Sequence, residues 1–202
     1  MINYTLNGEK IEQKNETTIL ESASKQGIKI PTLCNNEHLT PFGGCRLCLV
    51  DVATEKNPDL KKLIPSCTAK VGEGLIVETH SPKVIKARRF ILSMLISRSP
   101  KAEELKVLAK EIGLPHDSSN QTVAERYMLK DAPSIVDTNC ILCGLCVRAC
   151  AEIPMRDAIS FSARGMERTV KTPFEKYAET CIGCGSCAYV CPTNTIIIEE
   201  VV

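Results

Sequence analysis

The chain has 202 residues, which allows one or two small domains, with a formal charge of +1 and twelve cysteines. No apolar run approaches the roughly 20 residues of a membrane-spanning helix, and the N-terminus lacks a charged-then-apolar signal peptide. We therefore expect a cytoplasmic protein without a membrane span, whose thiols stay reduced. Four Tyr, four Phe and no Trp indicate small cores that gain stability from bound metal.

The first 80 residues predict a β-grasp ferredoxin fold. Asn7-Gly8 readily takes the positive φ angles of a two-residue turn, so residues 2–11 predict a β-hairpin. A helix and a long loop follow, and residues 46–52 and 75–79 predict two further strands. The order strand, strand, helix, loop, strand, strand is typical of that fold.

Three helices are predicted from their end signals. Thr18 and Glu21 form a capping box for a helix that Gly27 ends. Ser81-Pro82 supplies an N-cap and first turn for the second helix, and residues 101–112 predict the third, ended by a glycine. The second helix carries an apolar face formed by Val84, Ile91, Leu92, Leu95 and Ile96.

The basic side chains gather in this helical region, since residues 82–112 contain eight Lys or Arg and three Asp or Glu. A solvated helix face is the ordinary explanation, and docking against an acidic partner subunit is the alternative. No nucleic-acid recognition motif accompanies the charge, so we expect no nucleic acid partner. The basic residues largely off the apolar face are Lys83, Lys86, Arg88 and Arg89.

Eight cysteines in the C-terminal third form two runs with the spacing C-x2-C-x2-C-x3-C. This doubled spacing is typical of two-cluster ferredoxins, in which three cysteines of a run hold one 4Fe-4S cluster and the fourth reaches the other cluster. The predicted ligand sets are therefore crossed. One set is Cys140, Cys143, Cys146 and Cys191, and the other is Cys181, Cys184, Cys187 and Cys150.

Other uses of these cysteines fit less well. A structural zinc site closes with four ligands, whereas each run gives three evenly spaced cysteines and a distant fourth. Disulfides are disfavoured by the expected reducing compartment. Residues 183–188 formally match a dinucleotide-binding fingerprint, but that motif needs a strand before it and a helix after it in a βαβ unit. Two of its residues are already assigned as ligands.

The remaining cysteines, Cys34, Cys45, Cys48 and Cys67, have the spacing C-x10-C-x2-C-x18-C and predict a 2Fe-2S site. The first gap is longer than the four residues of the plant type. Gly43-Gly44 could bring backbone N–H groups to the cluster sulfurs or could form an ordinary turn. The three clusters together would move the formal charge to roughly −5.

The other C-terminal features are weaker. Residues 114–133 predict a linker or an extended strap. Residues 158–161 and 195–198 look like paired strands, one after each cluster loop, which would form an internal repeat. The three histidines, each expected at the surface because every cluster already has four cysteines, are His38, His80 and His116.

Taken together, these motifs resemble the N-terminal part of the iron-sulfur large subunit of NADH dehydrogenase (complex I). They are also similar to the small diaphorase subunit of NAD-linked hydrogenases and to the electron-entry regions of iron-only hydrogenases and formate dehydrogenases. The most specific segments are residues 140–146 and 181–187. Those relatives usually carry an extra cluster held by one His and three Cys. Residues 80–115 contain no cysteine, so the resemblance implies a shortened variant without it.

The predicted fold class is α+β. It comprises a β-grasp 2Fe-2S domain at residues 1–80, a helical connector and linker at 81–133, and a two-cluster ferredoxin-like domain at 134–202. The resemblance implies an electron-transfer subunit between a flavin- and NAD(P)H-binding subunit and a second redox subunit, without a catalytic site of its own. A freestanding polyferredoxin and a redox-sensing regulator are the alternatives.

Overall fold

The structure is a computed structural model that describes residues 1–114, 138–175 and 179–198. Its contacts divide the chain into two units. The first comprises Met1–Leu33 and Pro41–Leu92, and the second comprises Cys34–Thr40 and the chain from Ser93 onward. The short segment Cys34–Thr40 thus belongs with the C-terminal cysteines by its contacts. The predicted domain limits of 1–80, 81–133 and 134–202 stay predictions.

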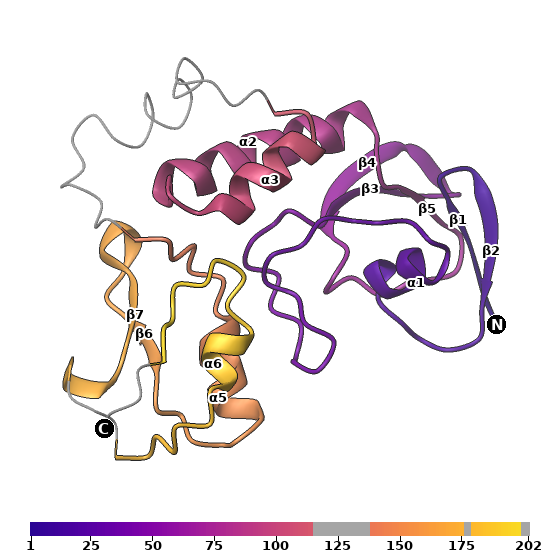
Figure 1. Ribbon diagram of the computed structural model, residues 1–202. Helices are drawn as coiled ribbons and strands as arrows, with labels where there is room; N and C mark the ends of the chain where they lie inside the picture. The colour runs from indigo at the N-terminus through magenta and orange to yellow at the C-terminus, as the bar shows by residue number, and fades with distance from the viewer. Residues whose placement is uncertain (115–137, 176–178, 199–202) are drawn as a thin grey trace. The chain divides into compact units, whose positions relative to one another are not determined.

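The first unit contains a five-stranded sheet in the order β2-β1-β5-β3-β4, with helix α1 (Ile19–Lys25) against it (Figure 1). The first strand is parallel to the fifth, and the other pairs are antiparallel. This mixed sheet with its single covering helix is the predicted β-grasp arrangement. The strands are β1 (Ile2–Leu6), β2 (Glu9–Gln13), β3 (Leu49–Thr54), β4 (Asn57–Pro65) and β5 (Leu75–Glu78).

The local signals at the start of the chain are confirmed. Asn7 and Gly8 have φ angles of 51° and 90°, as the hairpin turn requires. The Thr18 hydroxyl accepts a hydrogen bond from the backbone of Glu21, whose carboxylate accepts one from the backbone of Thr18 in return. The buried face of α1 packs into the core of the sheet, which is formed mainly by Tyr4, Leu6, Ile19, Ala23, Val50 and Val77.

Two strand predictions need correction. β3 begins at Leu49, not at residue 46, because Arg46 has a φ of 61°, which a strand cannot contain. β4 (Asn57–Pro65) was not predicted at all. It is an edge strand whose first six residues are exposed, so no buried face gives its sequence the apolar alternation of a half-buried strand.

Helices α2 (Pro82–Arg98) and α3 (Glu103–Glu111) follow the sheet. The Ser81 hydroxyl accepts a hydrogen bond of 3.2 Å from the Val84 backbone, which confirms the predicted N-cap. One residue of the predicted basic face differs: Arg88 is buried, because it lies on the same helix face as the buried Val84 and Leu92. Among the described residues, no helix is long and apolar enough to cross a membrane.

The C-terminal part of the second unit has short elements. Helices α5 (Leu145–Glu152) and α6 (Ser186–Tyr189) lie side by side (Figure 1). Strand β6 (Ser160–Ser162) pairs with β7 (Thr169–Lys171), and the short helices η2 (Gly165–Glu167) and η3 (Pro173–Glu175) follow β6 and β7 respectively. The predicted pairing of residues 158–161 with 195–198 is therefore wrong. The linker at 114–133, beyond its first residue, and His116 lie outside the described residues.

Candidate metal centres

The two cysteine runs fold in the same way locally. In the first run, Leu142 and Gly144 have φ angles of 54° and 75°, and α5 begins at the next residue. In the second run, Gly183 and Gly185 have φ angles of 65° and 74°, and α6 begins directly afterwards. Two residues with left-handed backbone conformation turn each loop tightly between its cysteines. The internal repeat is thus present in the loops and helices, not in paired strands.

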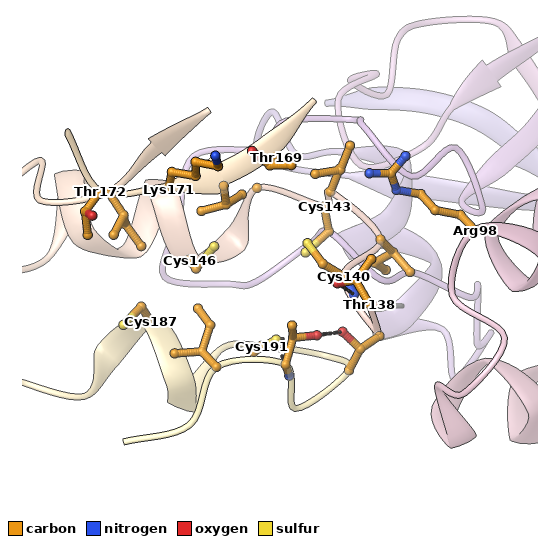
Figure 2. A pocket seen from close by; sticks show the side chains of 18 of the residues that line it. Arg98, Thr138, Cys140, Cys143, Cys146, Thr169, Lys171, Thr172, Cys187 and Cys191 are labelled. Atoms are coloured by element: carbon orange, nitrogen blue, oxygen red, sulfur yellow. Dashed lines mark hydrogen bonds between the residues drawn. The ribbon is translucent and has the colours of Figure 1, made fainter. Parts of the chain in front are cut away.

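A cavity of about 530 Å³ lies within the second unit (Figure 2). Its walls include the three N-terminal cysteines of the first run, Cys140, Cys143 and Cys146, together with Cys187 and Cys191 of the second. The other lining side chains are mainly apolar or neutral, such as Ile159, Val170 and Ile196. All four predicted ligands of the first 4Fe-4S cluster therefore line one cavity. Sulfur ligands in a largely apolar cavity fit an iron-sulfur cluster.

Two of the thiols in this cavity, those of Cys143 and Cys146, are buried away from water. Burial raises the pKa of Cys143 to about 11 and the pKa of Cys146 to about 12. Negative charge on neighbouring cysteines adds to the rise, and for Cys146 those neighbours are Cys143, Cys140 and Cys191. A bound metal has to replace these protons, so the site would bind iron with release of protons.

The second run has a different set of neighbours. Burial raises the pKa of Cys187, and the cysteines that add to the rise are Cys150 and Cys184. Cys150 is the fourth cysteine of the first run. Cys181 and Cys184 are exposed, whereas Cys187 is partly buried. A smaller cavity of about 330 Å³ lies beside Cys184 and Tyr189.

The fourth cysteine of each run receives a backbone hydrogen bond that the sequence analysis did not predict. The amide of Ala158 donates to the sulfur of Cys150, and the amide of Thr195 donates to the sulfur of Cys191, both over 3.3 Å. Burial opposes ionisation of Cys191, but backbone hydrogen bonds, including that from Thr195, lower the net pKa of its thiol. Such donors favour the thiolate that binds metal.

The cysteines of the predicted 2Fe-2S site are buried. The first unit contains Cys45, Cys48 and Cys67, and the sulfurs of Cys48 and Cys67 lie 3.4 Å apart. This separation suits two ligands of one metal ion. Cys34 is also buried, but it lies in the second unit, so its membership of the site stays a prediction. Buried cysteines at these positions fit a cluster, because thiolate is its usual ligand.

The glycine pair before Cys45 lies in a segment without regular secondary structure. Gly43 has a φ of 67°, which favours glycine, and a Cβ on Gly44 would lie 2.6 Å from the Phe42 ring. The approach of these backbone amides to cluster sulfurs stays a prediction. The two histidines within the described residues, His38 and His80, are both exposed, as predicted.

Two buried or partly buried arginines lie next to the cysteines and were missed at the level of sequence. Arg88 donates a hydrogen bond of 2.7 Å to the carbonyl of Leu49, the residue after Cys48. Burial lowers the pKa of Arg88 to about 10, so it remains charged at neutral pH. Arg148, on α5, donates a hydrogen bond of 2.6 Å to the carbonyl of Cys34. Sequence patterns gave no signal for either contact, because both depend on segments distant in the chain.

Comparison with known proteins agrees with the two kinds of site. Residues 1–82 match the family model of a 2Fe-2S iron-sulfur cluster binding domain, and residues 139–195 match that of a 4Fe-4S dicluster domain. The chain therefore combines an N-terminal 2Fe-2S domain with a C-terminal 4Fe-4S domain, as predicted. The exact number of 4Fe-4S clusters and the ligands of each stay predictions.

Several curated proteins are similar over nearly the whole chain. An NADH-quinone oxidoreductase subunit of Rhizobium meliloti is 30% identical over 98% of this chain and 24% of that protein. The NADP-reducing hydrogenase subunit HndD of Solidesulfovibrio fructosivorans is 32% identical over 99% of this chain and 36% of that protein. The alpha subunit of the NADPH-Fe(3+) oxidoreductase of Geobacter sulfurreducens is 31% identical over 98% and 24%. The chain thus spans about a quarter to a third of the length of these relatives.

A solved structure shows the same fold. A chain in the crystal structure of an NAD+-reducing NiFe hydrogenase in the H2-reduced state superposes with a TM-score of 0.74. The sequences are 24% identical, and the match covers 96% of this chain and 86% of the other. The sequence matches confirm the resemblance to subunits of NADH dehydrogenases and NAD-linked hydrogenases, and the solved structure supports the fold.

Proposed function

We propose that this chain is an iron-sulfur electron-transfer subunit of a multi-subunit oxidoreductase. It relays electrons between a flavin- and NAD(P)H-binding subunit and a second catalytic subunit of the hydrogenase, formate dehydrogenase or transhydrogenase type, in the cytoplasm. The observation that carries the proposal is the cavity that is lined by Cys140, Cys143, Cys146 and Cys191. Cysteines from two separate runs lining one apolar space favour a cluster that joins the two halves of the domain.

The proposed cofactors are one 2Fe-2S cluster and two 4Fe-4S clusters. Bound clusters would supply groups that accept and donate single electrons. The proposed ligands of the 2Fe-2S cluster are Cys34, Cys45, Cys48 and Cys67. Those of the 4Fe-4S clusters are Cys140, Cys143, Cys146 and Cys191 for one and Cys181, Cys184, Cys187 and Cys150 for the other.

The crossed ligand sets are supported by the charges that act on one thiol of each run. The cysteines that affect Cys146 are Cys140, Cys143 and Cys191, whereas those that affect Cys187 are Cys150 and Cys184. In each case the fourth cysteine comes from the opposite run.

The protein around the clusters has three roles. It holds the ligands, excludes water through the apolar lining of the cavity, and stabilises thiolates with backbone amides.

The proposed partners are inferred from the names of the similar proteins. Three of them are described as subunits of NADH-quinone oxidoreductase, NADP-reducing hydrogenase and NADPH-Fe(3+) oxidoreductase enzymes. All three names refer to a nicotinamide nucleotide, whose two-electron chemistry is usually linked to one-electron carriers by a flavin. We therefore infer a flavoprotein on one side of this chain.

The test is anaerobic purification from the source cells, followed by mass, flavin and iron analysis of the assembly that contains this chain. We expect about ten iron atoms for this chain, from the formal sum of one 2Fe-2S and two 4Fe-4S clusters, and co-migration with a flavoprotein. NADH or NADPH should reduce the clusters only in that assembly. Isolation of the chain alone with its iron and no flavin would instead favour a freestanding polyferredoxin.

A further inference from the structure

Arg88 is a buried cation on a helix whose other basic residues are mostly exposed. Its side chain is 3% exposed, and it lies on α2 between Val84 and Leu92, which are fully buried. These three residues follow one another at intervals of four, so they form one stripe on the helix. Lys86 and Arg89 of the same helix are exposed. The fold thus places one guanidinium inside the first unit.

The contacts of Arg88 do not neutralise its charge. One terminal nitrogen donates to the carbonyl of Leu49, and Nε is buried without a hydrogen-bond partner. Among the described residues, Arg88 forms no ion pair with a carboxylate. The buried Asp51 lies 3.4 Å from the amine of Lys83 and also accepts from Ser81. A buried charge normally has a partner, so an anionic group absent from the protein atoms would complete this site.

The predicted 2Fe-2S cluster is such a group. Leu49 directly follows Cys48, whose sulfur lies 3.4 Å from that of Cys67, and the Cys48 thiolate is the charge that acts on the Arg88 guanidinium. Four thiolates around an oxidised 2Fe-2S core give a net charge of about −2. The positive charge of Arg88, whose Nε has no hydrogen-bond partner, and the negative charge of this site are therefore complementary.

We propose that Arg88 is the buried counter-charge of the 2Fe-2S site and raises the reduction potential of the cluster held by Cys48 and Cys67. This inference rests on the proposed cluster at these cysteines. Reduction adds one negative charge, and a fixed cation stabilises the reduced form more than the oxidised form. Charges interact strongly where water is excluded, and net charge is one determinant of cluster potential.

Three substitutions test the proposal in the full, anaerobically purified chain. Arg88→Met removes the charge but keeps an apolar side chain of similar length. Arg88→Lys keeps the charge but changes the geometry. Lys86→Met removes an exposed charge from the same helix as a matched control. The measurement is a redox titration of the 2Fe-2S EPR signal, with the 4Fe-4S signals as internal references.

We expect Arg88→Met to lower the equilibrium constant for reduction about tenfold, which is about 59 mV for a one-electron couple. Arg88→Lys should lower the potential by less than half as much, and Lys86→Met should leave it unchanged. A loaded Arg88→Met cluster with the wild-type potential would overturn the proposal. An absence of any 2Fe-2S signal from the wild-type chain would instead contradict the proposed cofactor.

Loss of the cluster is also informative. Arg88→Gln is prepared with the other variants, because it is neutral but polar. Cluster binding by Arg88→Lys, combined with failure of both Arg88→Met and Arg88→Gln, would support a requirement for positive charge. If Arg88→Lys, Arg88→Met and Arg88→Gln all fail to bind the 2Fe-2S cluster while circular dichroism shows a folded sheet, the shape of arginine and not its charge is required. That result would overturn the proposed counter-charge.

Discussion

The guanidinium of Arg148 donates a hydrogen bond of 2.6 Å to the backbone carbonyl of Cys34. It also donates to the carbonyl of Thr40, and the amide of Thr40 donates over 2.7 Å to the carboxylate of Glu152. Arg148 and Glu152 lie one turn apart on α5, the helix that carries Cys146 and Cys150. The segment that contains a predicted 2Fe-2S ligand is thus fastened to the helix that carries predicted 4Fe-4S ligands.

Replacing Arg148 should therefore weaken the 2Fe-2S site. Hydrogen bonds from a charged group contribute about 1.5–3 kcal/mol each, and Arg148→Ala removes two of them from the Cys34 segment. We expect faster loss of the 2Fe-2S EPR signal on mild heating, while the 4Fe-4S signals persist longer. Arg156→Ala, which removes an exposed arginine that follows the same helix, is the control. Equal lifetimes of the 2Fe-2S signal in both variants would show that Arg148 does not position Cys34.

Crossed ligation makes a specific prediction for Cys191. Cys191→Ala should perturb the same cluster signal as Cys140→Ala, because both cysteines are assigned to one cluster and both act on the Cys146 thiol. Cys150→Ala should match Cys181→Ala in the same way. The measurement is Mössbauer and EPR spectroscopy of the four variants. If Cys191→Ala instead matches Cys181→Ala, the ligand sets are not crossed.

Removal of iron should affect the two kinds of site differently. The β-grasp sheet has its own apolar core, in which Ile19, Val50 and Val77 are fully buried. Around the 4Fe-4S runs the described helices and strands have eight residues or fewer. Short elements with a thin core depend on metal for stability. After anaerobic chelation we expect amide exchange to increase strongly in α5 and little in β3 and β5. Comparable increases in both regions would contradict this.

The capping box offers a prediction about stability. Thr18→Ala removes the hydroxyl that accepts from the Glu21 backbone, and loss of such a cap costs about 1 kcal/mol. The urea midpoint of the cluster-containing chain should fall accordingly. Ser24→Ala, an exposed position on the same helix, is the control and should change the midpoint by less than half as much. Similar losses for both variants would show that the cap adds little.

The capping box and the hairpin were predictable because they depend on residues close in the chain. Asn7-Gly8 specifies its turn through the backbone conformation of two adjacent residues. The cysteine spacing indicates cluster chemistry because the cysteines of one run lie close together in the chain. The features that were not predicted depend on contacts with segments distant in the sequence. Strand β4 has an exposed outer edge and no apolar alternation, so only its pairing with β3 defines it.

The contacts of charged residues also depend on segments distant in the sequence. Arg88 lies four residues from both Val84 and Leu92 of the predicted apolar face, a spacing that Lys86 lacks, but this spacing does not identify the partner of Arg88. Only the packing of α2 brings Arg88 to the carbonyl of Leu49, 39 positions earlier. β6 pairs with β7 and not with residues 195–198, whose apolar character suggested a strand.

His80 provides a test of the charge on Arg88 that does not involve a cluster. His80 is exposed as a residue, but partial burial of its imidazole, together with the positive charge of Arg88, lowers the pKa of His80, and its Nδ1 lies 2.7 Å from the Thr79 hydroxyl. As the pH falls, the unfolded chain takes up this proton at about pH 6.5, before the folded chain does. Protonation of the unfolded state therefore lowers the stability of the fold from about pH 6.5 downwards, and the full penalty is reached once the pH has fallen below the folded pKa.

We therefore expect the His80 imidazole resonances to titrate below about pH 6.5, the ordinary histidine value, in the intact protein. Arg88→Met should raise that midpoint toward the ordinary value, because it removes one of the two causes of the shift. Lys86→Met should not change it. An NMR titration that spans the ordinary histidine pKa on both sides measures all three proteins. A wild-type midpoint above the ordinary value, or no response to Arg88→Met, would show that the buried charge does not act on this histidine.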